Sequence, residues 1–179
     1  MKISRFLLNL WGWKIENILP DVSKCVIALA PHTSNWDFVI GKLAYSSIGR
    51  NARFLIKKEW FVFPFNLLFK SMGGIPIERN KKQSMTDTLA EEFDKHEDLQ
   101  LAITPEGTRK RVPEWRRGFY YIALKARVPI LLIALDYKKK AVVFLDLFYP
   151  TGDYEADLVK IKSYYKGVHA KNPKNFNPI

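Results

Sequence analysis

The chain has 179 residues, of which 47% are hydrophobic, and its 29 Lys and Arg residues against 18 Asp and Glu residues give a formal net charge of +11. This length fits one globular domain with a proper core and excludes a second full domain. The one cysteine, Cys25, excludes an intrachain disulfide framework and a cluster of thiolate metal ligands. Nowhere do about 18 uncharged apolar residues follow one another, so a membrane-spanning helix is not predicted.

The first segment, residues 1–20, is predicted to form an amphipathic helix. Apolar residues recur there at helical spacing, and Lys2, Arg5 and Lys14 supply positive charge. The pattern is typical of a helix lying in a membrane interface, and it fits a helix packed on the domain equally well. No cleavage site of small residues follows, so we expect a cytoplasmic protein, peripheral on the inner face of the membrane.

Beyond this segment the pattern alternates between strands and helices. Apolar runs predict strands at residues 22–30, 53–57, 74–77, 99–104, 129–135 and 141–148. Amphipathic spacing predicts helices at residues 35–48, 61–72, 84–93, 119–126 and 154–165. The alternation favours an α/β fold with a mostly parallel or mixed central sheet, helices on both faces and an antiparallel pair near the end. Residues 1–170 are expected to form the domain, and residues 171–179, which contain two Asn-Pro steps, a loose tail.

A histidine and an aspartate directly follow the first apolar strand, in the run Pro31-His32-Thr33-Ser34-Asn35-Trp36-Asp37. An imidazole becomes a useful general base near neutral pH when a carboxylate fixes its tautomer and stabilises the imidazolium. If the chain turns at His32 and then enters a helix, residues one turn apart face the same way, so Asp37 can reach the ring. These two residues are therefore the predicted catalytic pair.

A second patterned run, Pro105-Glu106-Gly107-Thr108-Arg109, follows another predicted strand. In open α/β sheets, ligands bind beyond the carboxyl ends of the strands. Because His32 and Glu106 each come just after a strand, we expect the fold to bring them to one rim of the sheet.

These runs resemble the glycerolipid acyltransferases typified by 1-acylglycerol-3-phosphate acyltransferase, whose hallmark is a His and an Asp separated by four residues. Three further segments resemble the family's second, third and fourth blocks: Gly74-Ile75-Pro76-Ile77-Glu78-Arg79, Glu106-Gly107-Thr108-Arg109 and Val128-Pro129-Ile130. Their order and spacing agree with the family over roughly residues 22–136.

The resemblance implies transfer of an acyl group from acyl-CoA or acyl-carrier protein to the hydroxyl of 1-acylglycerol-3-phosphate or a similar lysolipid, in membrane phospholipid biosynthesis. His32 would remove the hydroxyl proton while Asp37 orients its ring. Neither a covalent acyl-enzyme nor a metal or other cofactor is expected. Backbone N–H groups near Gly107, or at the helix start after His32, are both candidates to stabilise the oxyanion.

The resemblance also implies positive charge for the acceptor's phosphate. Arg79 and Arg109 stand at matching positions, with Lys57 nearby in sequence, and an arginine fork suits phosphate oxygens. Glu106 is expected to hold an arginine or the loop in place. Thr108 either caps a turn or donates to the phosphate, and Gly107 permits a close approach to substrate.

Three alternatives remain open at this point. The arginines could bind the carboxylate of an acylated amino acid or another lysolipid instead of a phosphate. The chain could also be a lipid-binding module without turnover. The basic excess suits anionic lipids and acyl-CoA phosphates, while the absence of a helix-turn-helix, ribonucleoprotein or zinc pattern argues against a nucleic-acid partner. The aromatic segment 61–69 is interpreted as core, as the wall of an acyl tunnel or as a membrane contact.

Overall fold

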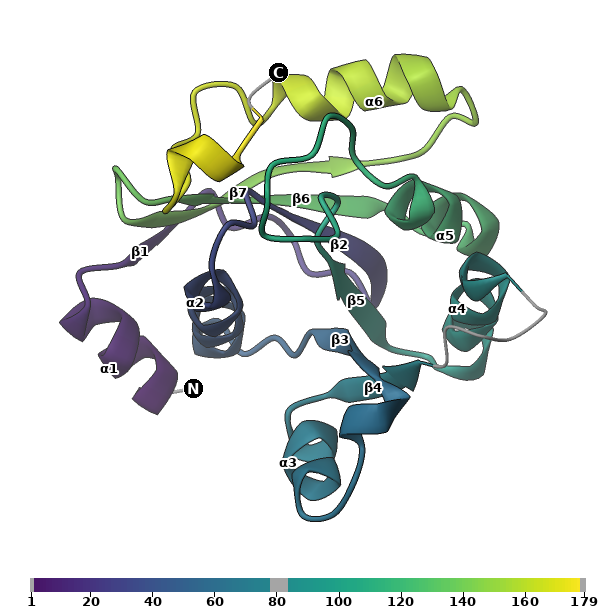
Figure 1. Cartoon of the computed structure of the whole chain (residues 1–179), viewed down its shortest axis with the longest axis horizontal. Coiled ribbons are helices and arrows are strands. Elements are labelled where there is room, and N and C mark those ends of the chain that lie inside the picture. The colour runs from purple at the N-terminus through teal and green to yellow at the C-terminus, as the bar shows by residue number, and fades with distance from the viewer. Residues whose placement is uncertain (1, 78–83, 178–179) are drawn as a thin grey trace.

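The computed structural model describes residues 2–77 and 84–177, in which helices and strands alternate along the chain (Figure 1). The helices are α1 (Lys2–Leu10), α2 (Asn35–Ser47), α3 (Phe65–Ser71), α4 (Met85–Lys95), α5 (Gly118–Ala126) and α6 (Tyr154–Ser163). The strands are β1 (Lys14–Glu16), β2 (Lys24–Ala30), β3 (Arg53–Lys57), β4 (Gly74–Ile77), β5 (Leu99–Ile103), β6 (Ile130–Asp136) and β7 (Ala141–Phe148). Short 3-10 turns lie at Lys58–Trp60 and Pro173–Asn175.

The described strands form one seven-stranded sheet in the order β1-β7-β6-β2-β5-β3-β4. Neighbouring strands are parallel except β6 and β7, which run antiparallel near the end of the chain as predicted. The mixed α/β class is thereby confirmed. Because β6, β2, β5, β3 and β4 run in the same direction, their carboxyl ends lie along one rim of the sheet.

Two apolar cores cover the opposite faces of this sheet. Side chains of β2 alternate between them, with Val26 and Ala28 facing one core and Cys25 and Ile27 facing the other. Helices α4, α5 and α6 cover the first face, and α1 and α2 cover the second (Figure 1). Every residue of β6 is buried, as expected for a central strand covered on both sides.

Helix α2 begins with a capping box that also sets the direction of a predicted site residue. The Ser34 side chain accepts a hydrogen bond from the backbone N–H of Trp36, and the Asp37 carboxylate accepts one from the backbone N–H of Ser34. Such reciprocal bonds satisfy donors that the first turn of a helix leaves unpaired. The box turns the Asp37 carboxylate back toward the residues that precede the helix, among which is His32.

The N-terminal segment is not one helix over residues 1–20. Helix α1 ends at Leu10, Gly12 turns the chain with a φ of +72°, and β1 then pairs with β7. The pairing of β1 is a tertiary contact, so no local pattern predicts it. Leu8 is buried in the core shared with α2, whereas Ile3 and Phe6 are exposed, so the helix packs on the domain by one face and leaves the other uncovered.

Two further segments differ from their predictions. Helix α3 begins at Phe65 rather than Phe61 and buries no residue, so the interpretation of its aromatic stretch as core is wrong. The predicted loose tail instead contacts the domain: Asn172 bonds to Thr33, and Phe176 is buried. Buried apolar area holds this segment in place, although its polar composition suggests mobility.

Candidate active site

Three adjacent parallel strands deliver polar side chains to the same rim of the sheet. His32 follows β2, Glu106 follows β5 on one side of β2, and Tyr137 follows β6 on its other side. The expectation that His32 and Glu106 meet is confirmed, because the Glu106 carboxylate oxygen Oε1 accepts a hydrogen bond of 2.9 Å from the backbone N–H of His32.

The predicted pair is close in space. His32 Nδ1 lies 3.3 Å from Asp37 Oδ2, within ion-pair distance, although the ring N–H is not aligned for a hydrogen bond. Catalytic hydrogen bonds in structures without substrate are often long or poorly aligned. The Asp37 side chain is completely buried, while 18% of the His32 side chain is exposed, so the histidine is the member of the pair that a substrate can reach.

The Asp37 carboxylate is held from several directions. Its Oδ2 accepts hydrogen bonds from the backbone N–H groups of Thr33 (2.7 Å) and Ser34 (2.8 Å), and its Oδ1 accepts one of 2.5 Å from the Tyr137 hydroxyl. Burial alone raises the pKa of Asp37, but the His32 ring, the Tyr137 hydroxyl and the two N–H groups outweigh it and hold the pKa below its usual value. Asp37 is therefore an anion whose orientation is fixed.

Glu106 bonds to residues 31–34, the segment between β2 and α2 that we call the histidine loop. Only 4% of the residue is exposed, and its Oε2 has no hydrogen-bond partner within the part of the chain that the structure describes. Burial raises the pKa of Glu106, against the opposing effect of the His32 backbone N–H. Its bond to that N–H fixes the turn carrying the imidazole, and among the described residues Glu106 makes no salt bridge or side-chain hydrogen bond with an arginine.

The remaining predicted site residues are distributed as follows. Gly107 lines the cleft beside His32, and its φ of +65°, together with an Arg116 side chain only 3.1 Å from where a Cβ would lie, disfavours any larger residue. The Arg109 guanidinium is exposed and donates a hydrogen bond to the Asn35 side-chain oxygen. The Thr108 hydroxyl accepts a long bond from the backbone N–H of Lys110, which fits its predicted capping of a turn.

Two predicted phosphate ligands are not placed by these contacts. Lys57 is the last residue of β3, at the rim where His32 and Glu106 lie, but its side chain is outside the described part of the structure. Arg79 lies outside the described residues altogether. Within residues 2–77 and 84–177, no group of three or more His, Cys, Asp or Glu side chains is arranged to hold a metal ion.

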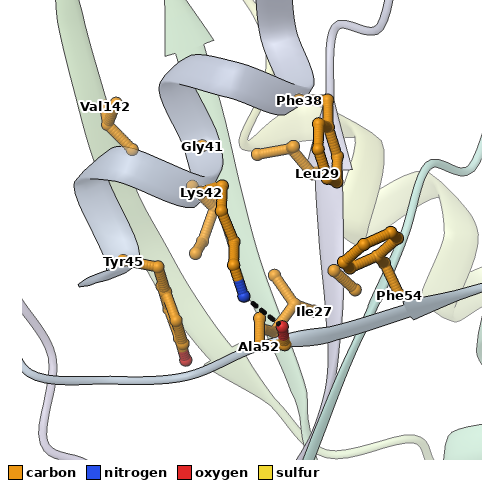
Figure 2. A pocket seen from close by; sticks show the side chains of 11 residues that line it. Ile27, Leu29, Phe38, Gly41, Lys42, Tyr45, Ala52, Phe54 and Val142 are labelled. Carbon is orange, nitrogen blue, oxygen red and sulfur yellow. Dashed lines mark hydrogen bonds between the residues drawn. The ribbon is translucent and has the colours of Figure 1, made fainter. Parts of the chain in front are cut away.

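His32 opens on a cleft of about 390 Å³ between α2, β3, β5 and the start of α4. Four apolar residues of this cleft, Leu29, Phe38, Phe54 and Ala102, also line a second cavity that lies between α2 and the sheet. Figure 2 shows this second cavity, which we call the chamber; Ile27, Gly41, Tyr45, Ala52 and Val142 lie around it, and Lys42 extends into it from α2. The cleft and the chamber thus share a wall that begins beside the histidine.

Lys42 is the one charged residue that lines the chamber. Its Nζ donates hydrogen bonds to the backbone oxygen of Ala52 (3.0 Å) and to the side-chain oxygen of Asn51 (2.9 Å). The dashed line in Figure 2 marks the bond to Ala52. Burial lowers the pKa of Lys42. The lysine therefore places a polar group against an otherwise apolar space.

Sequence reasoning missed Tyr137, Lys42 and the phenylalanines Phe38 and Phe54. Tyr137 had a usable signal, since it follows a predicted central strand at the rim where His32 and Glu106 were expected. Phe38, Phe54 and Lys42 gave none, because helix and strand residues that line a cavity have the same local pattern as residues of a closed core.

Comparison with known proteins now defines the class. The family model described as Acyltransferase matches residues 14–136, more than half of the chain, so the chain belongs to the acyltransferase family. Among solved structures, the chain is similar to that of the 1-acyl-sn-glycerophosphate (LPA) acyltransferase, PlsC, from Thermotoga maritima. The TM-score is 0.61 at 16% identity, over 90% of this chain and 73% of that chain, which establishes a shared fold. No curated protein sequence matches the chain.

Proposed function

We propose that this acyltransferase moves a fatty acyl group from acyl-CoA or acyl-carrier protein to the hydroxyl of 1-acylglycerol-3-phosphate or a similar lysolipid. The observation that carries the proposal is the His32–Asp37 pair, with a buried, fixed carboxylate 3.3 Å from the nitrogen of a reachable imidazole at the mouth of an apolar cavity. The imidazole lines a cleft that polar residues such as Asn35 and Thr104 share with apolar ones, and such a pair suits proton abstraction from an alcohol.

The chemistry follows from the two ends of the imidazole. With Asp37 beside Nδ1, that nitrogen keeps its proton, so Nε2 is the nitrogen that accepts the hydroxyl proton as the oxygen attacks the thioester carbon. The tetrahedral intermediate then expels the thiolate, which takes the proton back from Nε2 of the imidazolium, so that free thiol forms and the base is regenerated. Because a thiol pKa is about 8.5, this leaving group needs little help. Burial raises the pKa of Cys25 to about 12, so this cysteine remains a thiol and is not the nucleophile.

The chamber is the proposed site for the end of the acyl chain, since its volume of about 50 Å³ admits only a few carbons. Its walls are apolar apart from Lys42, and it shares Leu29, Phe38, Phe54 and Ala102 with the cleft that contains His32. Transfer of methylene groups from water to such a space contributes about 0.8 kcal/mol each. An acyl chain that enters the chamber would leave the thioester carbonyl in the cleft. There the His32 imidazole can take the proton of the attacking hydroxyl.

The acceptor's anionic group is proposed to bind at Arg109, with Lys57 and Arg79 as further cations of the same site. Arg109 supports this role because it is exposed at the rim, and its described partner is the neutral side-chain oxygen of Asn35. A guanidinium binds phosphate and carboxylate oxygens alike. An acylated amino acid is therefore the second candidate acceptor.

The protein is proposed to act as a peripheral enzyme on the inner, anionic face of the membrane. On α1, Ile3, Phe6 and Leu10 are 77%, 65% and 67% exposed, and Lys2 and Arg5 lie exposed on the same helix. This combination of apolar and basic residues suits the lipid interface. Within the described residues, no helix is both long enough and apolar enough to cross a membrane.

The test is acyl transfer from a labelled long-chain acyl-CoA to 1-acylglycerol-3-phosphate on vesicles, with free thiol measured as the second product. We expect transfer by the wild type and a loss of at least about 100-fold in His32→Ala, while His96→Ala, on the far end of α4, should remain active. Transfer to other lysolipids only, or from acyl-carrier protein only, would change the substrate. If the wild type transferred no acyl group with any of these pairs, the chain would be a lipid-binding module.

A further inference from the structure

The Asp37 carboxylate has a partner that lies outside the His32–Asp37 run and just beyond the family match at residues 14–136. Tyr137 Oη donates a 2.5 Å hydrogen bond to Asp37 Oδ1 from 100 positions away in the sequence. The other oxygen, Oδ2, serves the histidine loop, since it lies 3.3 Å from His32 Nδ1 and accepts from Thr33 and Ser34. Oδ1 of Asp37 therefore contacts Tyr137, and Oδ2 contacts the histidine loop.

We propose that Tyr137 is a positioning residue for acyl transfer, which holds the Asp37 carboxylate by Oδ1 so that Oδ2 stays directed at the His32 ring. This inference rests on the proposed function. The two backbone donors hold only Oδ2, so the plane of the carboxylate could still turn about the bond that joins it to the side chain. A donor on Oδ1 removes that freedom, so the imidazole is oriented before substrate arrives.

The surroundings of Tyr137 are built to keep it in this place. Its ring meets the buried Trp13 edge to face, with ring centroids 4.9 Å apart, and its backbone N–H donates a 2.8 Å bond to the His169 backbone oxygen. Burial, and secondarily the Asp37 carboxylate, raise the pKa of Tyr137, so the hydroxyl keeps the proton that it donates. Trp13 near the N-terminus and His169 near the C-terminus thus both hold Tyr137 in place.

The C-terminal segment also supports a residue that donates to the other oxygen of Asp37, Oδ2. Asn172 donates from its backbone N–H to the Thr33 hydroxyl (3.1 Å) and from its side chain to the Thr33 backbone oxygen (2.8 Å). Thr33 is the residue whose own N–H reaches Asp37 Oδ2. The segment around residues 169–172 therefore fixes donors to both oxygens of Asp37.

The deciding variant is Tyr137→Phe, which keeps the ring and its packing on Trp13 but removes the hydroxyl. The matched control is Tyr164→Phe, because Tyr164 donates a 2.5 Å bond to Asp146 Oδ2 in the same chemical arrangement near the end of α6. Both variants lose one tyrosine–carboxylate bond, and only the first bond touches the proposed catalytic pair.

We expect kcat to fall about tenfold or more in Tyr137→Phe with little change in the KM of either substrate, and to stay near wild type in Tyr164→Phe. Loss of the hydroxyl also leaves more negative charge on Asp37 for the imidazolium. The acid limb of the pH–rate profile should therefore move to higher pH, by roughly half a unit to one unit. A role limited to packing would lower thermal stability without moving this limb.

A measurement without turnover separates this inference from the proposed function. The ring signals of His32 can be titrated by NMR in the wild type and in both variants, with His32→Ala used for assignment. We expect the midpoint of the His32 ring titration to rise in Tyr137→Phe alone. An unchanged midpoint, or equal effects of the two variants, would overturn the positioning role, whereas a shifted midpoint in a protein that transfers no acyl group would overturn only the proposed reaction.

Discussion

Asp37 has both a structural and a proposed catalytic role, and these roles share the same oxygens. Its carboxylate caps α2 through Ser34 and accepts from Thr33, and it also lies beside the imidazole of His32. The capping box explains why the aspartate turns back toward the preceding loop, and that direction is the one that a catalytic partner requires. One residue thus links the start of a helix to the orientation of a base.

Asp37→Asn is expected to change stability in a pH-dependent way. The folded-state pKa of Asp37 is below its unfolded value, so the stabilisation is present at neutral pH and is lost as the pH falls through the folded-state pKa. We expect the variant to lose about 1–2 kcal/mol of unfolding free energy at pH 7, with the gap to wild type closing in acid. Urea unfolding of both proteins over a descending pH series measures this difference.

The control for this series is Asp153→Asn. Asp153 caps α6 by accepting from the backbone N–H of Ala156, and it is exposed. Its replacement should cost little at every pH because asparagine is an equally good cap. A gap between wild type and Asp37→Asn that stays constant from neutral pH into acid would contradict the assignment of an ionised, stabilising carboxylate.

At the scale of elements, the packing of α2 on the sheet leaves room for the chamber at Gly41. A Cβ added to Gly41 would lie 3.3 Å from Leu29 Cδ2, so even a small side chain reaches the wall that the chamber and the cleft share. Glycine in a helix interior costs roughly 0.5–1 kcal/mol relative to alanine. The cavity beside the histidine loop therefore depends on a residue that weakens the helix.

Gly41→Val is expected to discriminate between donors by length. The added methyl groups occupy space in the chamber, so the KM for a long-chain acyl-CoA should rise by about tenfold while a two-carbon or four-carbon donor is used nearly as before. Initial rates over a series of donor chain lengths test this expectation. Gly118→Val serves as the control, because a Cβ at Gly118 has nothing within 4 Å. Equal losses with short and long donors would place the acyl chain elsewhere.

At the scale of the whole molecule, the exposed apolar side chains are distributed unevenly. Figure 1 shows α3 at the bottom of the view, α1 at the lower left and α6 at the top, on the other side of the sheet. Exposed apolar side chains gather on the two lower helices and the turn before α3: Ile3, Phe6, Leu10, Val62, Phe63, Phe65, Leu67 and Leu68. These side chains are the ones that the proposed membrane contact would use.

Phe6→Glu is expected to weaken binding to anionic vesicles by about tenfold or more, because it puts a charge on the exposed apolar face of α1 and loses about 1.5–3 kcal/mol of burial in lipid. Val159→Glu is the matched control, since Val159 is 71% exposed on α6 at the opposite side. Vesicle sedimentation at 0.05 M and 0.5 M salt compares them. Equal weakening by both variants would remove α1 from the contact, and binding insensitive to salt would assign it to apolar residues alone.

Much of the fold could be predicted from local pattern. The strands at Arg53–Lys57, Gly74–Ile77 and Ala141–Phe148 have the predicted bounds, because apolar and β-branched runs flanked by turns or charges leave little choice. Helix α4 begins at Met85, one residue after the predicted start, with Ser84 as its N-cap residue. The short strand β1 and the late start of α3 were missed, since the first depends on pairing with β7 and the second on the chain path around Pro64.

The candidate site, like the fold, could be predicted only in part from the sequence. His32, Asp37 and Glu106 could be found because each stands in a short run directly after an apolar strand, and their meeting follows from the parallel order of the strands. Tyr137 also follows an apolar strand at this rim, but its contact with Asp37 could not be assigned from the sequence, and neither could the chamber residues. The contact of Tyr137 depends on how the end of β6 lies against the Asp37 carboxylate, and the chamber depends on how closely α2 approaches the sheet. Neither arrangement is encoded in the local sequence.

By itself, the sequence determined the α/β class, the family resemblance and the proposal of His32 and Asp37 as the catalytic pair, because periodicity and four-residue spacing are local properties of the chain. Only the tertiary structure decided that Tyr137 bonds to Asp37, that Asn172 bonds to Thr33 beside His32, and that a chamber lined in part by Lys42 shares a wall with the cleft of His32. These contacts join segments far apart in sequence, and their formation depends on the packing of both faces of the sheet.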